Sequence, residues 1–334
     1  MKKKILLVSH SLSKTGAPLV LVNIANHLDL LGYNVFLYNV NSSQKALINR
    51  LNDSIKIIHY SSFISNLKNK KSFFLNIIGR TLGKLLPISK DFNSIIKNNK
   101  PDLVIFNTIF HLHLSKIVEK HEIKSIRYIH ESWSFLSTLS TADRFNLLTS
   151  RDKFIACSEN VKYLIESYYG IENVNVIYPI LNRDSLNVSQ EKINTFTVCS
   201  AGSVYFIKGF DIWIEVAKKT LDIDENIIFE WYGSNSDDKY FNYYIKKIPE
   251  KYLHRIIYKG EVQNLSSAIS NRNLFFLSSR EDSFPVVCLE ALESGLPLIG
   301  FKSGGIEEFE EFGYSTTFKM GEIEQISKSI IEHK

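Results

Sequence analysis

The segment 278–292 combines residue types that could bind a diphosphate. Asp282 and Glu290 stand eight positions apart, and Pro285 lies between them where we expect the first turn of a helix. Proline is tolerated in a first turn because its missing N–H would have no partner there, and Asp282 or Ser283 could cap the helix. The free amides of a helix N-terminus attract anions, so the segment predicts a phosphate site.

The two acids would flank such a diphosphate. Their separation along a helix is roughly 12 Å at 1.5 Å per residue, which could place one carboxylate near a sugar and the other near a ribose. Glu290 also interrupts the apolar run 286–292, where a charge is costly unless it is paired or hydrogen-bonded. Ribose hydroxyls would satisfy it, while the alternative for either acid alone is a helix cap or a solvated helix edge.

These residues belong to a chain in which short apolar runs alternate with helical patterns. Alternation of this kind requires crossover connections and predicts parallel sheets, that is, an α/β fold with two Rossmann-like halves. The predicted strands of the first half are 5–8, 35–38, 103–106, 125–129, 154–156 and 174–177. Those of the second half are 196–200, 227–232, 256–259, 274–277 and 298–301.

A polar stretch without clear periodicity, 182–192, separates the two series. We therefore expect two domains, 1–184 and 185–334. In open parallel sheets the ligand lies outside the carboxyl ends of the strands, so two such sheets placed edge to edge would leave a cleft for a shared ligand. The candidate residues follow strands, as this arrangement requires.

The composition excludes several classes of protein. With 334 residues, of which 44% are hydrophobic and 22% charged, the chain is long enough to bury two cores and is neither disordered nor fibrous. Its net charge of +5 and the lack of a binding signature argue against nucleic acid as a partner. Cys157, Cys199 and Cys288 lack metal-ligand spacing and are expected in the core. The chain opens on a strand pattern instead of a signal peptide and has no run near the roughly 20 apolar residues of a membrane span, which predicts a cytoplasmic protein.

The run around the two acids resembles the signature of a known family, the retaining glycosyltransferases of family 4 (glycosyl transferases group 1). These enzymes have the GT-B fold, in which two Rossmann-like domains face each other across a cleft. Their signature is E-x-F-G-x-x-x-x-E-A, followed by a G-x-P-V-I strand and a G-G-x-x-E loop. The matching residues are 282–291, 295–299 and 304–308, in the same order and with the same spacing. The resemblance implies transfer of a sugar from a nucleotide-diphosphate sugar.

Two residues depart from this signature. Asp282 stands where the family usually has Glu, and Pro285 replaces the usual Gly. Because Pro285 removes one amide donor from the phosphate site, we expect those contacts at Val286 and Val287. Glu281 could replace Asp282 as the first acid.

A second match lies in the segment 202–211, directly after a predicted strand. It is similar to the family's G-R-x-x-x-x-K-G segment, whose Arg and Lys bind the donor diphosphate. Lys208 takes the lysine position, where a point charge suits phosphate and a departing nucleotide. Ser203 occupies the arginine position, so either Arg280 compensates or donor affinity is lowered. Without the resemblance, a lone lysine before a glycine would indicate a surface turn.

Positions in the first half resemble the family as well. Gly16 opens the first helical pattern and looks like the family's glycine-bearing loop, where a substrate approaches the backbone. His130 ends a predicted strand where these enzymes place a histidine facing the donor sugar; the alternative is a histidine hydrogen-bonded inside the sheet. Ser158 and Glu159 match a family pair, but as a helix cap Ser158 needs no further role.

The stretch 68–97 contains seven basic residues and one acid among apolar side chains. Such a stretch can lie on an anionic membrane surface, so one interpretation is peripheral contact with the inner face of the membrane and a lipid-linked acceptor. The other interpretation is an ordinary amphipathic helix whose apolar face lies in the core.

For individual residues the resemblance implies specific roles, with His130, Lys208 and Asp282 at the reacting centre. It implies retention at the anomeric carbon, a UDP- or GDP-sugar as co-substrate, a glycan or lipid-linked acceptor, and neither cofactor nor metal. The donor-binding residues that it implies are Gly16, Gly202, Ser203, Lys208, Glu281, Asp282, Ser283, Phe284, Pro285, Val286, Val287 and Glu290.

Other functions fit the sequence less well. A metal-dependent transferase would use a D-x-D pair after a strand, whereas Asp222 and Asp224 stand between a helical pattern and the next strand, as in a polar loop. No G-x-G-x-x-G follows the first strand, which argues against hydride transfer with a dinucleotide. The substitutions at Ser203 and Asp282 leave one alternative open, a donor-binding partner subunit with little turnover.

Overall fold

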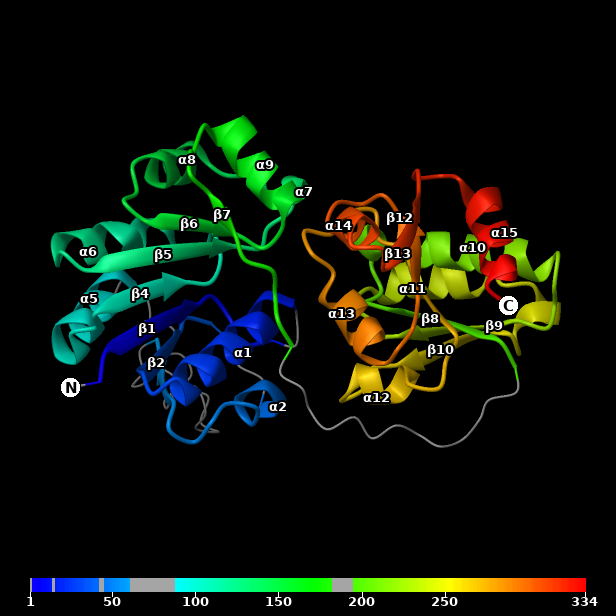
Figure 1. The fold of residues 1–334 in the computed structure, drawn as a ribbon, viewed down its shortest axis with the longest axis horizontal. Coiled ribbons are helices and arrows are strands. Elements are labelled where there is room, and N and C mark those ends of the chain that lie inside the picture. Colours follow the sequence, from blue (N-terminus) through cyan, green and yellow to red (C-terminus); the bar gives the residue numbers. More distant parts are fainter. Residues whose placement is uncertain (1, 14–15, 42–44, 61–87, 182–194) are drawn as a thin grey trace. The chain divides into compact units, whose positions relative to one another are not determined.

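The computed structural model describes residues 2–13, 16–41, 45–60, 88–181 and 195–334 (Figure 1). The chain divides into two compact units, Met1–Ile180 and Leu181–Lys334, here called the N-terminal unit and the C-terminal unit. The boundary predicted between residues 184 and 185 falls in the stretch 182–194, outside the described residues.

The N-terminal unit is built on a parallel seven-stranded sheet with the order β3-β2-β1-β4-β5-β6-β7 (Figure 1). Its strands are β1 (Lys4–Ser9), β2 (Asn34–Asn39), β3 (Lys56–His59), β4 (Leu103–Phe106), β5 (Lys124–Ile129), β6 (Lys153–Ala156) and β7 (Asn175–Val176). Its helices are α1 (Gly16–Leu30), α2 (Lys45–Ile48), α5 (Ile88–Asn99), η1 (Leu112–Leu114), α6 (Ser115–Lys120), α7 (Trp133–Leu136), α8 (Thr141–Leu148) and α9 (Glu159–Tyr169).

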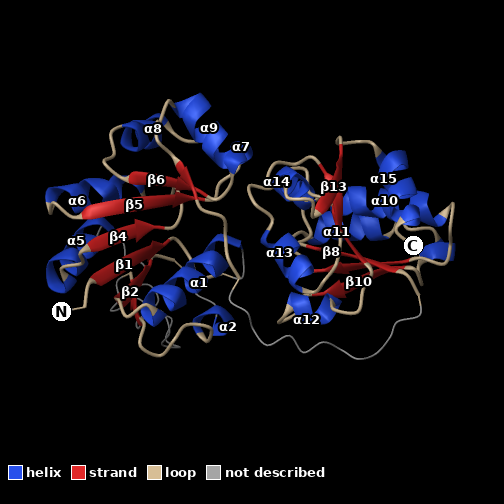
Figure 2. Ribbon diagram, viewed as in Figure 1, coloured by secondary structure: helices blue, strands red, loops and turns tan. Residues whose placement is uncertain are grey.

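The C-terminal unit repeats this plan with six parallel strands in the order β10-β9-β8-β11-β12-β13. Figure 2 shows its strands in red and its helices in blue. The strands are β8 (Thr197–Ala201), β9 (Ile228–Tyr232), β10 (Ile256–Gly260), β11 (Leu274–Leu277), β12 (Leu298–Phe301) and β13 (Ser315–Phe318). The helices are η2 (Phe206–Lys208), α10 (Phe210–Leu221), α11 (Asp238–Ile245), η3 (Glu250–Tyr252), α12 (Leu265–Ile269), α13 (Val286–Glu293), α14 (Ile306–Glu311) and α15 (Ile323–Glu332).

Strand periodicity explains why each sheet has a core on both faces. Successive side chains of a strand point to opposite faces, so Leu7 of β1 packs in the cluster beneath α1, whereas Leu6 and Val8 pack in the cluster beneath α5. In the C-terminal unit one large cluster, which includes Trp213 of α10 and Ile330 of α15, joins these two helices to the sheet. Strands buried on both faces give the continuous apolar runs that the sequence shows.

The predicted α/β fold with two parallel sheets is confirmed, and every predicted strand is present with ends that differ by no more than one residue. Two strands were missed, β3 and β13. Both lie at the edge of their sheet, and their side chains are partly buried or exposed, so their sequences lack a continuous apolar run. The three cysteines are buried and free, as predicted.

The basic stretch 68–97 is described only from residue 88 onward; its earlier part lies outside the described residues. Residues 88–97 belong to α5, whose apolar side chains Phe92, Ile95 and Ile96 are buried in the core. For this part the structure agrees with an ordinary amphipathic helix. Among the helices in the described ranges, none has the length and apolar character that crossing a bilayer requires.

Candidate functional site

Each sheet has one topological switch point, that is, two neighbouring strands from which the chain continues toward opposite edges of the sheet. In the C-terminal unit this switch point lies between β8 and β11, and in the N-terminal unit between β1 and β4. Ligands of open parallel sheets bind outside the carboxyl ends of the strands at such points. Most of the candidate residues follow these strands, so two regions are described, here named the lysine edge (202–211 and 278–290) and the histidine edge (His10, 107–111, His130 and Glu131).

At the lysine edge the structure brings Lys208 and Asp282 together. Lys208 Nζ donates to Asp282 Oδ2 at 2.5 Å, and the two side chains are 26% and 11% exposed, so the pair is reachable from solvent. Burial tends to lower the pKa of Lys208, but the Asp282 carboxylate outweighs it and raises the pKa above its ordinary value. Lys208 is therefore a cation whose position depends on Asp282.

A glycine makes this contact sterically accessible. Gly209, next to Lys208, has a φ of 70°, and a Cβ there would lie 2.0 Å from the backbone oxygen of Ser278. Ser278 Oγ donates to the backbone oxygen of Lys208 at 3.1 Å, which ties the two loops together. The close approach of η2 to the end of β11 therefore requires glycine, as the family-like K-G pair suggests.

The helix that follows β11 begins later than predicted. Its N-cap is Pro285, in extended conformation, and α13 starts at Val286, so neither Asp282 nor Ser283 caps it and Pro285 precedes the first turn. The reason is that the backbone around Asp282 pairs with another segment: Asp282 N donates to the oxygen of Ser303 (2.8 Å), and Gly305 N donates to the oxygen of Asp282 (2.9 Å).

The first amides of α13 are consequently those of Val286 and Val287, which have no intrahelical acceptor in an α-helix. Cys288 N donates to the oxygen of Pro285 at 2.9 Å, so the ladder starts with the third helical residue. Phe284 is buried and stacks on Phe309 with ring centroids 4.9 Å apart. Phe284 anchors the segment in the core, while the preceding residue, Ser283, is partly buried.

Ser203, at the position of the family's arginine, contacts a serine, and Arg280 is engaged elsewhere. Ser203 Oγ lies 3.3 Å from Ser234 Oγ. Arg280, which could have compensated, makes a bidentate ion pair with Asp211 at 2.8 and 2.6 Å and packs over the ring of Phe206. It also donates to the backbone oxygen of Phe206 at 2.6 Å. The structure thus gives Arg280 the role of fixing η2 to the start of α10.

Three more predicted residues of the lysine edge lie after β8, beside Asp282 and in α13. Gly202 follows β8, and its backbone oxygen accepts a hydrogen bond from Trp231 Nε1 at 2.9 Å. A Cβ on Gly233 would lie 2.1 Å from that oxygen, so the turn after β8 is closely packed. Glu281 and Glu290 are partly buried, the first beside Asp282 and the second in the body of α13.

At the histidine edge, His130 follows β5 and contacts Asn107, which follows β4. Asn107 Nδ2 donates to the backbone oxygen of Ala17 at 2.8 Å, so its Oδ1 faces His130 Nε2 at 3.2 Å and accepts a hydrogen bond from the protonated Nε2. Burial, with a smaller effect of His10, lowers the pKa of His130 to about 3. His130 is therefore a neutral imidazole at physiological pH.

Glu131 is the functional candidate that the sequence reasoning missed. Its carboxylate accepts hydrogen bonds from the backbone amides of Ile109 (3.2 Å) and His130 (3.1 Å). Burial raises its pKa to about 7, although these amides and Arg127 act in the opposite direction. The available signal was its position directly after His130 at the end of a strand, where polar residues gather in this fold.

Two more histidines lie at this edge. His10 follows β1 and stacks on Phe110 with ring centroids 4.7 Å apart. Within the described ranges, His10 Nδ1 and His111 Nε2 are buried and have no hydrogen-bond partner. Gly16 is the first residue of α1 and is exposed. Ser158 accepts a hydrogen bond from Val161 N as the cap of α9, so its match to the family pair is explained by capping.

The D-x-D pair lies in a polar loop between α10 and β9, as predicted. Asp222 accepts from Tyr252 Oη at 2.6 Å and pairs with Lys251, whereas Asp224 pairs with Lys334 at 2.6 Å. The two carboxylates thus have separate partners. In the part of the chain that the structure describes, no group of three or more His, Cys, Asp or Glu residues could hold a metal ion.

Comparison with protein families gives a match in each half of the chain. Residues 183–333 match the model described as glycosyl transferases group 1, and residues 15–185 match the model described as glycosyltransferase family 4. An uncharacterized glycosyltransferase of Haemophilus influenzae is 23% identical over 321 residues, which cover 93% of this chain and 84% of that protein.

Solved structures show the same fold. HepE of Anabaena, in complex with UDP and glucose, superposes with a TM-score of 0.78 at 18% identity, covering 98% of this chain and 89% of that one. A variant of TarM from S. aureus, in complex with fondaparinux, α-GlcNAc-glycerol and UDP, also gives 0.78 at 12% identity, covering 99% and 92%. The likeness shows the GT-B fold, which is built from two Rossmann-like domains.

Proposed function

Because the chain belongs to glycosyltransferase family 4, we propose that this glycosyltransferase moves a sugar, with retention of anomeric configuration, from a nucleotide-diphosphate sugar to a glycan or lipid-linked acceptor. In this proposal residues 185–334 bind the donor and residues 1–184 bind the acceptor. Lys208, Asp282 and His130 act at the reacting centre.

The observation that carries the proposal is the Lys208–Asp282 pair beside the start of α13. A diphosphate bound at the amides of Val286 and Val287 would offer Lys208 a second anionic partner, and the cation would stabilise the charge that develops as the nucleotide departs. Asp282 holds the lysine ready and contacts a sugar hydroxyl. Glu290, one turn further along α13, serves the ribose, and Glu281, Ser283, Phe284 and Pro285 shape this site together with Gly202 and Ser203.

The donor is proposed to be a UDP- or GDP-sugar. Complexes of the structurally similar HepE with UDP and with UDP-glucose support a uridine nucleotide. A thermal-shift screen across UDP-, GDP-, ADP- and CMP-sugars tests this choice, because a ligand that binds the folded state raises the melting temperature. A shift that persists undiminished in Lys208→Ala would contradict binding at the lysine edge.

Retention and metal independence are part of the same proposal. The reaction would be assisted by the leaving diphosphate on the same face of the sugar, with no protein nucleophile. Proton NMR of the first-formed product shows the anomeric configuration, and turnover in excess EDTA shows whether a divalent metal is needed. An inverted product, or activity restored only by manganese, would reject this mechanism.

For the acceptor we propose a sugar-bearing molecule of surface polysaccharide or glycoconjugate synthesis, used in the cytoplasm at the inner face of the membrane. The similar fold of TarM, solved with fondaparinux and α-GlcNAc-glycerol, supports a glycan. The basic stretch 68–97 motivates the membrane contact. Cosedimentation with anionic and with neutral phospholipid vesicles tests it; equal sedimentation with both would remove the electrostatic argument.

A second candidate function is a nucleotide-sugar-binding partner subunit with little turnover. It is favoured by Ser203, which replaces the family's arginine, while Arg280 is paired with Asp211. Isothermal titration and donor hydrolysis by the purified chain separate the two functions. Tight binding without hydrolysis or transfer to any acceptor would support the partner subunit.

A further inference from the structure

Arg127 is a charged side chain that is completely buried in the N-terminal unit. On one side its Nε donates to Asp152 at 2.9 Å and its Nη2 to Ser115 Oγ at 2.7 Å. On the other side its Nη1 donates to the backbone oxygens of Thr108 (2.7 Å) and Phe110 (3.1 Å). The guanidinium therefore connects a buried carboxylate to the loop 107–111, which follows β4.

The carboxylate end of this connection is firmly held. Asp152 accepts hydrogen bonds from Ser115 Oγ at 2.7 Å and from Ser125 Oγ at 2.5 Å, in addition to that from Arg127. Burial tends to raise the pKa of Asp152, but Arg127 and the two hydroxyls outweigh it and hold the pKa below its ordinary value. A charged Asp152 and a planar guanidinium form a rigid support, since the fork of an arginine fixes the direction of each donor.

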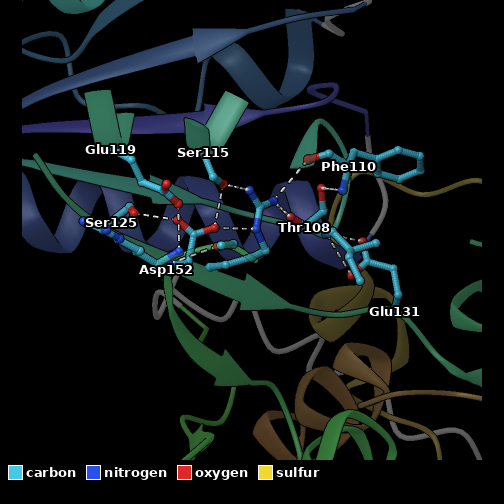
Figure 3. Close-up of polar contacts among 11 residues, drawn as sticks. Thr108, Phe110, Ser115, Glu119, Ser125, Glu131 and Asp152 are labelled. Atoms are coloured by element: carbon cyan, nitrogen blue, oxygen red, sulfur yellow. Dashed lines mark hydrogen bonds and ion pairs between the residues drawn. The ribbon is translucent and has the colours of Figure 1, made fainter. Parts of the chain in front are cut away.

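Glu131 holds the same loop through a different group. Its carboxylate accepts from the amide of Ile109, which lies between the two carbonyls that Arg127 holds. Two side chains thus bind three consecutive residues of the loop, 108 to 110. Arg127 lies in β5 and Glu131 follows that strand; Figure 3 labels Thr108, Phe110 and Glu131. Glu131 also accepts from the amide of His130, so it joins the loop to the proposed sugar-contacting residue.

The loop carries groups of the histidine edge. Asn107, at its start, accepts from His130 Nε2 and sets the tautomer of that imidazole. Phe110 stacks on His10 and lies 4.9 Å, centroid to centroid, from Phe135. A shift of the loop backbone would therefore move both the partner of His130 and an aromatic ring of the edge.

We propose that Arg127 and Glu131 are positioning residues for sugar transfer, which together clamp the loop 107–111 so that His130 and Asn107 meet the sugar in a fixed geometry. This inference rests on the proposed function, because the sugar is assigned to His130 there. A merely structural role for the buried network would instead affect the stability of the unit and leave the chemistry of the folded protein unchanged.

The test compares Arg127→Lys, Glu131→Gln and the control Ser125→Ala in the full chain. Arg127→Lys keeps the charge but loses the fork, and Glu131→Gln keeps one acceptor oxygen. Ser125→Ala removes a hydrogen bond from the same network without touching the loop. Two readouts are measured on each variant: the ring nitrogens of His130 by long-range ¹H–¹⁵N NMR of ¹⁵N-histidine protein, and turnover of UDP-glucose.

We expect wild type and Ser125→Ala to show a neutral His130 with the proton on Nε2, and both clamp variants to show altered ring-nitrogen shifts. The kcat should fall about 10- to 100-fold in the clamp variants, with an unchanged KM for the donor, since misplacement of a reacting group costs rate more than binding. Partial recovery in Glu131→Asp would agree with the clamp.

Unaltered His130 signals in both clamp variants, or an equal change in Ser125→Ala, would overturn the proposal. Wild-type kcat in the clamp variants would do the same. If wild type does not turn over UDP-glucose, that donor is rejected, and the NMR comparison, which needs no ligand, still decides on the clamp.

Discussion

At the lysine edge the polar groups are charged and paired, whereas at the histidine edge burial works against charge. Lys208 and Asp282 form an ion pair at 2.5 Å, and Arg280 and Asp211 form a second one at 2.6 Å. His130, by contrast, has its pKa lowered to about 3, and Glu131 has its pKa raised to about 7. The two edges occupy equivalent positions in sheets of the same type, so the difference lies in the side chains.

This difference indicates two kinds of ligand chemistry. A cationic side chain that is paired with a carboxylate can turn toward a diphosphate, because the diphosphate offers a new ion pair in place of the one with the carboxylate. A neutral imidazole, and a carboxyl group whose pKa lies near physiological pH, suit hydroxyl groups as partners, because a hydroxyl group donates and accepts hydrogen bonds without carrying a charge. The comparison is the reason why we propose the nucleotide diphosphate at the lysine edge and uncharged sugar groups at the histidine edge.

The largest expected effect is at Lys208. Lys208→Ala should lower kcat/KM for transfer by about 10²–10³-fold, the loss typical when one group that stabilises developing charge is removed. The control Lys219→Ala removes the same charge from an exposed pair with Glu324 at 2.9 Å and should keep wild-type activity. Steady-state kinetics with the best donor of the thermal-shift screen give both values; full activity of Lys208→Ala would end the assignment of the diphosphate to this edge.

The second prediction concerns the geometry of the lysine edge. Gly209 and Gly295 have similar φ values, 70° and 78°, but a Cβ on Gly209 would lie 2.0 Å from the backbone of Ser278, while a Cβ on Gly295 has open space. Gly209→Ala should therefore destabilise the chain by about 1–3 kcal/mol more than Gly295→Ala, the usual cost of overpacking. Urea unfolding of both variants measures the difference. Equal losses would show that the two loops adjust freely.

A smaller effect is expected from His130 as the pH falls. Its pKa is about 3 in the folded chain and near 6.5 when unfolded, so protonation of the unfolded chain favours unfolding below pH 6.5. Wild type should lose stability relative to His130→Gln as the pH falls from 6.5 toward 3, by at most about 1.4 kcal/mol per pH unit. Melting temperatures at pH 7 and pH 4.5 test this; parallel curves would mean that His130 is solvated.

The last effect concerns Glu131 and has the opposite dependence on pH. Its pKa rises from 4.5 to about 7 on folding, so the stability it contributes is fully present below pH 4.5 and is lost as the pH rises through 7. The melting temperature of Glu131→Gln relative to wild type should therefore increase between pH 4.5 and pH 7.5. A constant difference across this range would show that the carboxylate is not desolvated and would weaken the contrast between the edges.

Much of the fold could be predicted from the sequence because its signals are local. A strand such as β11 is buried on both faces and so appears as a continuous apolar run, Leu274–Leu277, with the predicted ends. The edge strands β3 and β13 lack that run, since fewer neighbours cover them, and were missed. The spacing of the two acids and the K-G pair could also be recognised in the sequence, because each motif is a short, continuous stretch of the chain.

Which residues meet was decided by the tertiary structure. Lys208 and Asp282 are 74 positions apart and touch because the sheet order places β8 beside β11. The start of α13 at Val286 depends on pairing between Asp282 and the segment 303–305, and the pKa of Glu131 depends on burial beside the loop 107–111. Hydrogen bonding, desolvation and charge pairing act between segments distant in sequence, so they arise only once the sheets have assembled.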